Sequence, residues 1–233
     1  MSKKDYFITE KNINKIINNK YTCFLDPSTL SKVASKLKGY NYQIYYPYKE
    51  ADKVLIYTKE TPEIRLLEII SYDKLTHREI LGSLFGLNID SELFGDIIID
   101  NNHYYIMVMD NIYDLIIKNY NMIGNKHIKL KEVPLSTIDS YQRKYEEVEL
   151  IVSSTRIDTV ISRLIGISRD SVKKKFQDNE VILNYEVCNK INYNLNNNDI
   201  FSIRKYGKYK YIGIIKTSKK DKYIIKIYKY VDN

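Results

Sequence analysis

Residues 156–184 read RIDTVISRLIGISRDSVKKKFQDNEVILN, and this stretch decides the fold of the last third of the chain. Apolar residues recur at helical spacing over 157–165, and Gly166 then interrupts the pattern. Ser168 has the side chain and the position of an N-cap for a second helix. The mainly apolar segment 181–184 follows. The stretch therefore predicts two short helices joined by a tight turn and followed by a strand.

The second helix has an apolar side and a basic side. Val172 and Phe176 lie four residues apart and are expected to face a core, whereas Arg169 and Lys173, also four apart, share an outward face with Lys174. Helix N-termini and guanidinium groups bind phosphate oxygens. We therefore expect the three cations to contact the backbone of structured RNA, whose deep, narrow groove hides its base edges.

Arg156, which opens the first helix, is the fourth residue expected to bind RNA phosphate. In the alternative interpretation, its guanidinium pairs with Asp158 or Glu180. The lysine run at 173–175 has an alternative of the same kind, as an ordinary solvated helix face. The sequence leaves both alternatives open.

The order of helix, tight turn, basic helix and strand resembles the S4-type RNA-binding domain. Four segments carry the resemblance: Arg156-Ile157-Asp158, Ile167-Ser168-Arg169, Glu180-Val181-Ile182-Leu183-Asn184 and Asn198-Asp199-Ile200-Phe201-Ser202-Ile203. Asn198 stands where the family usually has Gly, and we expect it to adopt a left-handed conformation. Tyr185 stands where many members have Gly after the Asn, so the turn there is expected to differ in shape.

The eight residues from Arg204 read RKYGKYKY and alternate cations with aromatic rings. Arg204, Lys205 and Lys208 are expected to form a second rank of RNA contacts, with tyrosine rings able to stack on unpaired bases. The alternative is a β-ribbon in which period-two alternation turns Tyr209 and Tyr211 inward. For these two tyrosines the ribbon is the preferred interpretation.

Positive charge is concentrated in the same third of the chain. The whole chain carries a net charge of +8, and residues 153–233 alone hold 17 basic and 8 acidic side chains. The remaining 152 residues hold 20 basic and 21 acidic side chains and are nearly neutral. A basic segment joined to a neutral body favours a module that binds a polyanion.

The first two thirds of the chain contain signals for mixed helices and strands. Apolar spacing predicts a helix over 7–18, and Asp26 precedes a second helix that has Pro in its first turn. Thr76 has capping-box spacing to Glu79. Asn101-Asn102 lies between two apolar runs, as in a β-hairpin. The expected fold class is α+β.

Three further segments make the chain similar to the YlmH family of bacterial proteins: Phe24-Leu25-Asp26-Pro27, residues 75–87, and Phe94-Gly95-Asp96-Ile97-Ile98. The resemblance implies an α+β N-terminal domain (1–73), a ferredoxin- or RRM-like middle domain (74–148), and an S4-type domain with a β-strand tail (149–233). It also implies binding to rRNA of the large ribosomal subunit and to tRNA, in rescue or quality control of stalled translation. A link to cell division is suggested for the family.

No catalytic, metal or cofactor site is expected. Cys23 and Cys188 are isolated in the sequence, and His77, His103 and His127 fall on separate predicted elements. The 8 Gly form no nucleotide-binding fingerprint. A noncatalytic RNA-binding protein is therefore preferred. The alternatives are an RNA-modifying enzyme, since some enzymes carry S4-type domains, and an adaptor for the division apparatus.

A cytoplasmic monomer is expected. The longest apolar run, Tyr104–Met109, is far shorter than the roughly 20 residues of a membrane-spanning helix. The first residues lack the apolar core of a signal peptide. Structured RNA and the large ribosomal subunit are the expected partners, and no membrane is expected among them.

Overall fold

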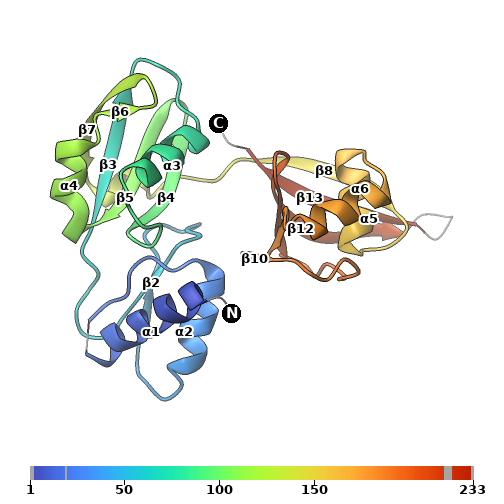
Figure 1. Cartoon of the computed structure of the whole chain (residues 1–233), viewed down its shortest axis with the longest axis horizontal. Helices are drawn as coiled ribbons and strands as arrows, with labels where there is room; N and C mark the ends of the chain where they lie inside the picture. The colour runs from blue at the N-terminus through green and yellow to red at the C-terminus, as the bar shows by residue number, and fades with distance from the viewer. Residues whose placement is uncertain (1–2, 19, 218–221, 232–233) are drawn as a thin grey trace. The chain divides into compact units, whose positions relative to one another are not determined.

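The computed structural model describes residues 3–18, 20–217 and 222–231. The chain divides into two compact units, and the boundary in the sequence lies between Gln142 and Arg143 (Figure 1). Helices and strands occur in both, which confirms the α+β class.

The first unit begins with two helices and a short hairpin. These elements are α1 (Lys3–Ile17), α2 (Pro27–Lys36), β1 (Gln43–Tyr45) and β2 (Leu55–Tyr57). Asp26 caps α2 by accepting a 3.0 Å hydrogen bond from the backbone N–H of Thr29, and Pro27 occupies the first turn as predicted. Ile16, Leu25, Val33 and other apolar side chains make a small core of their own.

A five-stranded antiparallel sheet follows in the order β4-β5-β3-β7-β6. The strands of this sheet and the helices between and after them are β3 (Ile64–Ser71), α3 (His77–Gly86), β4 (Phe94–Asp100), β5 (His103–Met109), η1 (Asp110–Ile112), α4 (Tyr113–Asn119), β6 (Met122–Ile123), β7 (Lys126–Val133) and η2 (Leu135–Ile138). The chain order β3-α3-β4-β5-α4-β7, with β3 central, is that of the ferredoxin-like fold. The structure therefore contains the ferredoxin- or RRM-like arrangement expected for the middle of the chain.

The expected domain boundary at residue 73 does not match this sheet. β3 lies within the segment 1–73, yet Leu67 pairs with Ile106 of β5 on one side and with Glu132 of β7 on the other. The RRM-like sheet therefore includes residues before 74. Local alternation identifies β3 as a strand, but its partners lie some 40 to 65 residues later in the chain, and local patterns do not reveal such pairing.

Two local predictions in this unit are confirmed. Thr76 accepts a hydrogen bond from the backbone N–H of Glu79, and the Glu79 carboxylate accepts one from the N–H of Thr76, which completes the capping box. Asn101 and Asn102 have φ angles of 48° and 69° and form the tight turn between β4 and β5.

Two of the segments that carry the family resemblance pack against each other. The ring of Phe24 lies over Gly95, where an added Cβ would be 2.9 Å from Cε1 of that ring. The backbone N–H of Phe24 also donates to the carbonyl of Glu92 at 2.9 Å. Gly95 is therefore required for this close approach.

The second unit is a six-stranded antiparallel sheet, in the order β10-β9-β11-β12-β13-β8, with two helices against it (Figure 1). Its elements are β8 (Tyr145–Val152), α5 (Ile157–Ile165), α6 (Arg169–Gln177), β9 (Val181–Leu183), β10 (Glu186–Val187), β11 (Ile200–Ile203), β12 (Gly207–Thr217) and β13 (Tyr223–Tyr230). Its core joins α5 and α6 to one face of the sheet.

The expected start of this domain at residue 149 lies inside β8. This strand pairs with β13 along its whole length, from Tyr145 opposite Tyr230 to Val152 opposite Tyr223. The expected β-strand tail is present as β12 and β13, which extend the sheet beyond β11. None of the helices in the described ranges is long and apolar enough to cross a membrane.

Candidate RNA-binding surface

The two helices of the second unit form as the sequence predicts. Gly166 ends α5 in a left-handed conformation with φ 67°. Ser168 caps α6 by accepting a 3.2 Å hydrogen bond from the N–H of Ser171. Val172 and Phe176 are buried against the sheet. This packing fixes which side of α6 faces solvent.

Arg169, Lys173 and Lys174 are exposed on α6. Within the described part of the chain, no ion pair or side-chain hydrogen bond engages these three cations. Their outward position agrees with the helical spacing, and their contact with RNA phosphate stays a prediction.

Lys175, the next residue of the lysine run, is held differently. Its ammonium donates to Glu180 at 2.9 Å and lies 5.0 Å from the ring centroid of Tyr206. The Lys175 and Glu180 side chains are only 16% and 18% exposed. The hydrogen bond from Lys175 lowers the pKa of the Glu180 carboxyl below its ordinary value. Lys175 thus ties α6 to the sheet.

Arg156 forms the pair that the sequence left open as an alternative. Its guanidinium donates to both carboxylate oxygens of Asp158, at 3.1 Å and 2.8 Å. The Asp158 side chain is 10% exposed, whereas that of Arg156 is 45% exposed. Arg156 is therefore oriented by a carboxylate while its outer edge stays accessible to solvent.

The turn between β11 and β12 brings two of the second-rank cations beside α6. Arg204 and Lys205 are exposed there, and Lys205 has a left-handed φ of 73°. The backbone N–H of Arg204 donates to the carbonyl of Glu180 at 3.0 Å. The Lys175 ammonium lies over the ring of Tyr206. The C-terminal end of α6 and this turn thus present cations from two parts of the sequence.

Lys208 does not lie with the cations of α6 and of the turn that holds Arg204 and Lys205. Its ammonium lies 4.8 Å from the ring centroid of Tyr185 and 4.6 Å from that of Tyr230, and it donates to the Tyr185 hydroxyl at 3.2 Å. Lys208 is opposite Ser202 in the sheet, and its neighbour Tyr209 is opposite Phe201, which is buried under the helices. Alternation therefore turns Lys208 to the other face.

The tyrosines of the tail follow the β-ribbon interpretation. Tyr209 and Tyr211 are 4% and 2% exposed and belong to the core. Of the two turn residues singled out in the sequence, Asn198 adopts the expected left-handed conformation, whereas Tyr185 takes the left-handed conformation that Gly favours, which does not support the expected change in turn shape. Asn198 is left-handed with φ 72°, and Tyr185 has φ 69° in the two-residue turn between β9 and β10.

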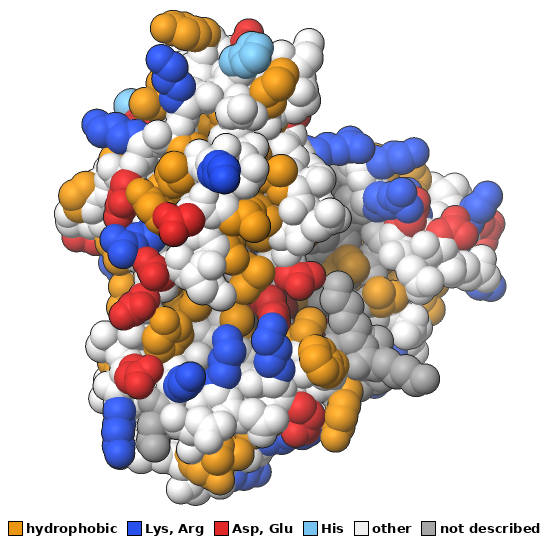
Figure 2. All heavy atoms as spheres, turned by 60° about the vertical axis from the view of Figure 1, so that its left-hand side comes forward, with side chains coloured by type: hydrophobic (Ala, Val, Ile, Leu, Met, Phe, Trp, Pro, Cys, Tyr) orange, Lys and Arg blue, Asp and Glu red, His pale blue; other side chains and the backbone are white. Residues whose placement is uncertain are grey.

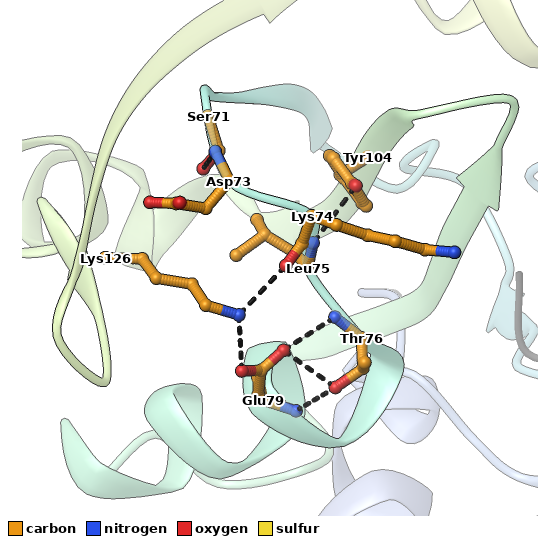
Figure 3. A network of polar contacts seen from close by, with 8 residues as sticks. All are labelled: Ser71, Asp73, Lys74, Leu75, Thr76, Glu79, Tyr104 and Lys126. Carbon is orange, nitrogen blue, oxygen red and sulfur yellow. Dashed lines mark hydrogen bonds and ion pairs between the residues drawn. The ribbon is translucent and has the colours of Figure 1, made fainter.

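Charge in the first unit is mixed. Figure 2 shows basic and acidic side chains interspersed over the face that it presents. A network around α3 illustrates this: Lys126 donates to Glu79 at 2.6 Å and to the carbonyl of Lys74 at 2.9 Å (Figure 3). The hydrogen bonds from Lys126 and Thr76 lower the pKa of Glu79 to about 2.

Arg78 is exposed in the first turn of α3, next to His77. With Glu79, Gly82, Ser83 and Gly124 it lines a shallow depression of about 400 Å³. Among the described residues, no group of three or more His, Cys, Asp or Glu side chains is placed to hold a metal ion.

Sequence reasoning missed the tyrosines that accompany Lys208 on its face of the sheet. They are Tyr145 of β8 and Tyr228 and Tyr230 of β13, and Lys210 of β12 lies directly opposite Tyr228. Strand alternation over 223–230 is visible in the sequence. The pairing of β13 with β8, about 80 residues earlier in the chain, is not.

Comparisons with known proteins show similarity to RNA-binding and ribosome-associated proteins. Residues 58–137 match a family model described as "Putative RNA-binding domain in YlmH". This segment includes β3 and thus agrees with the sheet rather than with a boundary at residue 73. The chain is 25% identical over 217 residues to "Ribosome-associated protein quality control protein P2" of Bacillus subtilis (strain 168), covering 88% of this chain and 84% of that protein.

A solved structure is also similar. "Cell division protein ylmH from Streptococcus pneumoniae" has a TM-score of 0.49 and 23% sequence identity, and the likeness covers 60% of this chain and 97% of that one.

Proposed function

We propose that this chain, which matches the YlmH RNA-binding model over residues 58–137, is a noncatalytic RNA-binding protein of the YlmH type that associates with the ribosome in the rescue or quality control of stalled translation. The proposed partners are rRNA of the large subunit and tRNA, and the proposed acting form is a monomer. The name of the Bacillus subtilis relative supports the ribosomal part of this proposal.

One observation carries the RNA-binding part of the proposal. Arg169, Lys173 and Lys174 extend from one short helix into solvent, and Arg204 and Lys205 stand on the adjacent turn. Cations carried by a packed helix recognise the phosphate geometry of a folded RNA rather than its sequence. This distinguishes them from Lys175, whose charge is used inside the unit.

The test is co-sedimentation with purified ribosomes at rising KCl, comparing the wild type with Arg169→Ala/Lys173→Ala. We expect the variant to dissociate from ribosomes at a lower KCl concentration. Each lost phosphate contact reduces the number of counterions that binding releases and so weakens the affinity. The matched control is Lys20→Ala/Lys38→Ala, which removes two exposed charges from the first unit. Equal salt profiles for the wild type and the helix variant would overturn the proposed surface.

The noncatalytic part needs a separate measurement. Mass mapping of rRNA and tRNA from cells that lack the protein is expected to show the full set of modifications. A modification that is missing without the protein and restored by the wild type would identify an RNA-modifying enzyme instead.

A further inference from the structure

The sheet of the second unit has two unlike faces. One face packs against α5 and α6 through Phe201, Tyr209, Tyr211 and Ile227. Residues directly opposite each other in an antiparallel pair point to the same side, and neighbours along a strand point to opposite sides. The other face therefore carries the alternate residues, and no helix among the described residues of this unit lies on it.

Register places five side chains together at one end of this open face. Tyr145 is opposite Tyr230, and Lys210 is opposite Tyr228. Lys208 is two residues before Lys210 on β12 and contacts Tyr230. We call Tyr145, Tyr228, Tyr230, Lys208 and Lys210 the tyrosine face.

The rings of the tyrosine face are arranged as a continuous aromatic surface. Tyr145 and Tyr228 are stacked, with centroids 5.2 Å apart and planes at 24°. Tyr145 meets Tyr230 edge-on at 5.2 Å and 80°. All three side chains are half-buried. Because each ring is supported by another, the surface is preformed and needs little ordering to accept a flat ligand.

Cations surround these rings. The Lys208 ammonium lies between Tyr185 and Tyr230, and the Arg143 guanidinium is 5.2 Å from the centroid of Tyr230. Glu147 lies opposite Tyr228 on this face and accepts a 3.0 Å hydrogen bond from Lys226. Lys226 offsets the charge of this carboxylate, and Lys208, Lys210 and Arg143 add positive charge around the rings.

We propose that the tyrosine face is a second RNA-binding site, which takes unpaired nucleotides by stacking bases on Tyr228 and Tyr145 while Lys210 and Lys208 hold the phosphates. The inference rests on the proposed RNA-binding function and adds a substrate class to it. Aromatic rings with flanking cations bind single strands with little sequence preference, because every base has a π-face.

The two sites lie on opposite sides of one sheet and differ in chemistry. The α6 surface offers mainly cations, with the single exposed ring of Tyr206 on the adjacent turn, as suits a folded RNA backbone, whereas the tyrosine face offers several rings together with charges. A protein partner would instead use the apolar far end of the open face, where Ile151 is 51% exposed opposite Ile224.

The test uses the full chain and two RNA probes, an oligouridylate of about ten nucleotides and a stable hairpin without long single strands. Tyr228→Leu keeps an apolar strand residue but removes the ring. We expect it to weaken binding of the oligouridylate on the order of tenfold and to leave hairpin binding unchanged. Arg169→Ala/Lys173→Ala should do the reverse. Ile151→Thr, on the same face, is the matched control and should change neither.

A second readout does not depend on the stability of any variant. Oligouridylate containing 4-thiouridine is cross-linked to the wild type, and the labelled peptides are mapped. Cross-links to 223–230 or 145–152 support the site. Cross-links confined to α6, or wild-type affinity in Tyr228→Leu, overturn it while leaving the proposed function intact. If the hairpin also fails to bind the wild type, the proposed function fails as well.

Discussion

The Arg156 guanidinium donates to both carboxylate oxygens of Asp158, two residues along the chain, at 3.1 Å and 2.8 Å. This pair joins the residue before α5 to the first turn of that helix, where a carboxylate is also favoured by the helix dipole. Arg156 therefore has a structural role, although one edge of its guanidinium is exposed. The Arg169 side chain has no ion-pair or hydrogen-bond partner among the described residues.

This difference predicts unequal effects on RNA binding. Arg169→Ala should lower the slope of log affinity against log salt by about 0.7 to 0.9, the value for one phosphate contact. Arg156→Ala should change the slope less, because Asp158 already neutralises its charge. It should instead destabilise the fold by about 1–3 kcal/mol, since Asp158 is left without its donor. Filter-binding titrations and urea unfolding measure the two quantities, and equal slopes for the two variants would contradict the assignment.

Adjacent lysines of α6 are expected to separate in the same way. Lys174→Ala should weaken RNA binding and leave the thermal midpoint unchanged, because its side chain is exposed. Lys175→Ala should lower the thermal midpoint, because it removes the partner of Glu180 and the contact with Tyr206. Calorimetry of both variants checks the prediction. A lower midpoint for Lys174→Ala alone would show that the two side chains have been assigned the wrong way round.

Gly95→Ala is predicted to destabilise the first unit by about 1–3 kcal/mol, the usual cost of overpacking. The added Cβ would be 2.9 Å from Cε1 of Phe24 and 3.1 Å from Cβ of Met107. Combining it with Phe24→Leu should cost less than the sum of the two single changes, because the smaller side chain makes room. A double-mutant cycle in urea measures this coupling. Strict additivity would show that the two residues do not interact.

Acid should weaken the first unit partly through Glu79. Hydrogen bonds from Lys126 and Thr76 lower the pKa of this carboxyl from 4.5 to about 2. A carboxylate with a depressed pKa stabilises the fold above its unfolded pKa, and this contribution is lost as the pH falls from about 4.5 towards 2. The urea midpoint of the wild type should therefore fall more steeply below pH 4.5 than that of Glu79→Gln.

Because the Glu79 side chain is 38% exposed, high salt should reduce the difference between these two proteins. Parallel pH profiles at low salt would mean that the contacts with Lys126 and Thr76 do not stabilise the fold.

The sequence was most informative about the candidate site where neighbours in the chain decide the structure. Gly166, Ser168 and the inward pair Val172 and Phe176 act within one or two helical turns, and all four behave as predicted. The outward position of Arg169 follows from the same helix.

Whether each cation is paired within the unit or exposed to solvent depends on residues distant in the sequence, or on small differences in its angular position on the helix. Residues 173–175 are three consecutive lysines, yet only Lys175 contacts both Glu180 and Tyr206. The α6 lysines and the turn with Lys205 come together because β11 pairs with β9.

By itself, then, the sequence determined the helices, the capping, the turns, the asymmetry of charge and the family resemblance, because each depends on short-range preferences or on composition. Only the tertiary structure decided that β3 is the central strand of the first sheet and that Tyr145, Tyr228 and Lys208 share an open face. The reason is physical: strand pairing is a long-range choice among many apolar segments of similar propensity, and packing of the whole sheet selects the partner and the register.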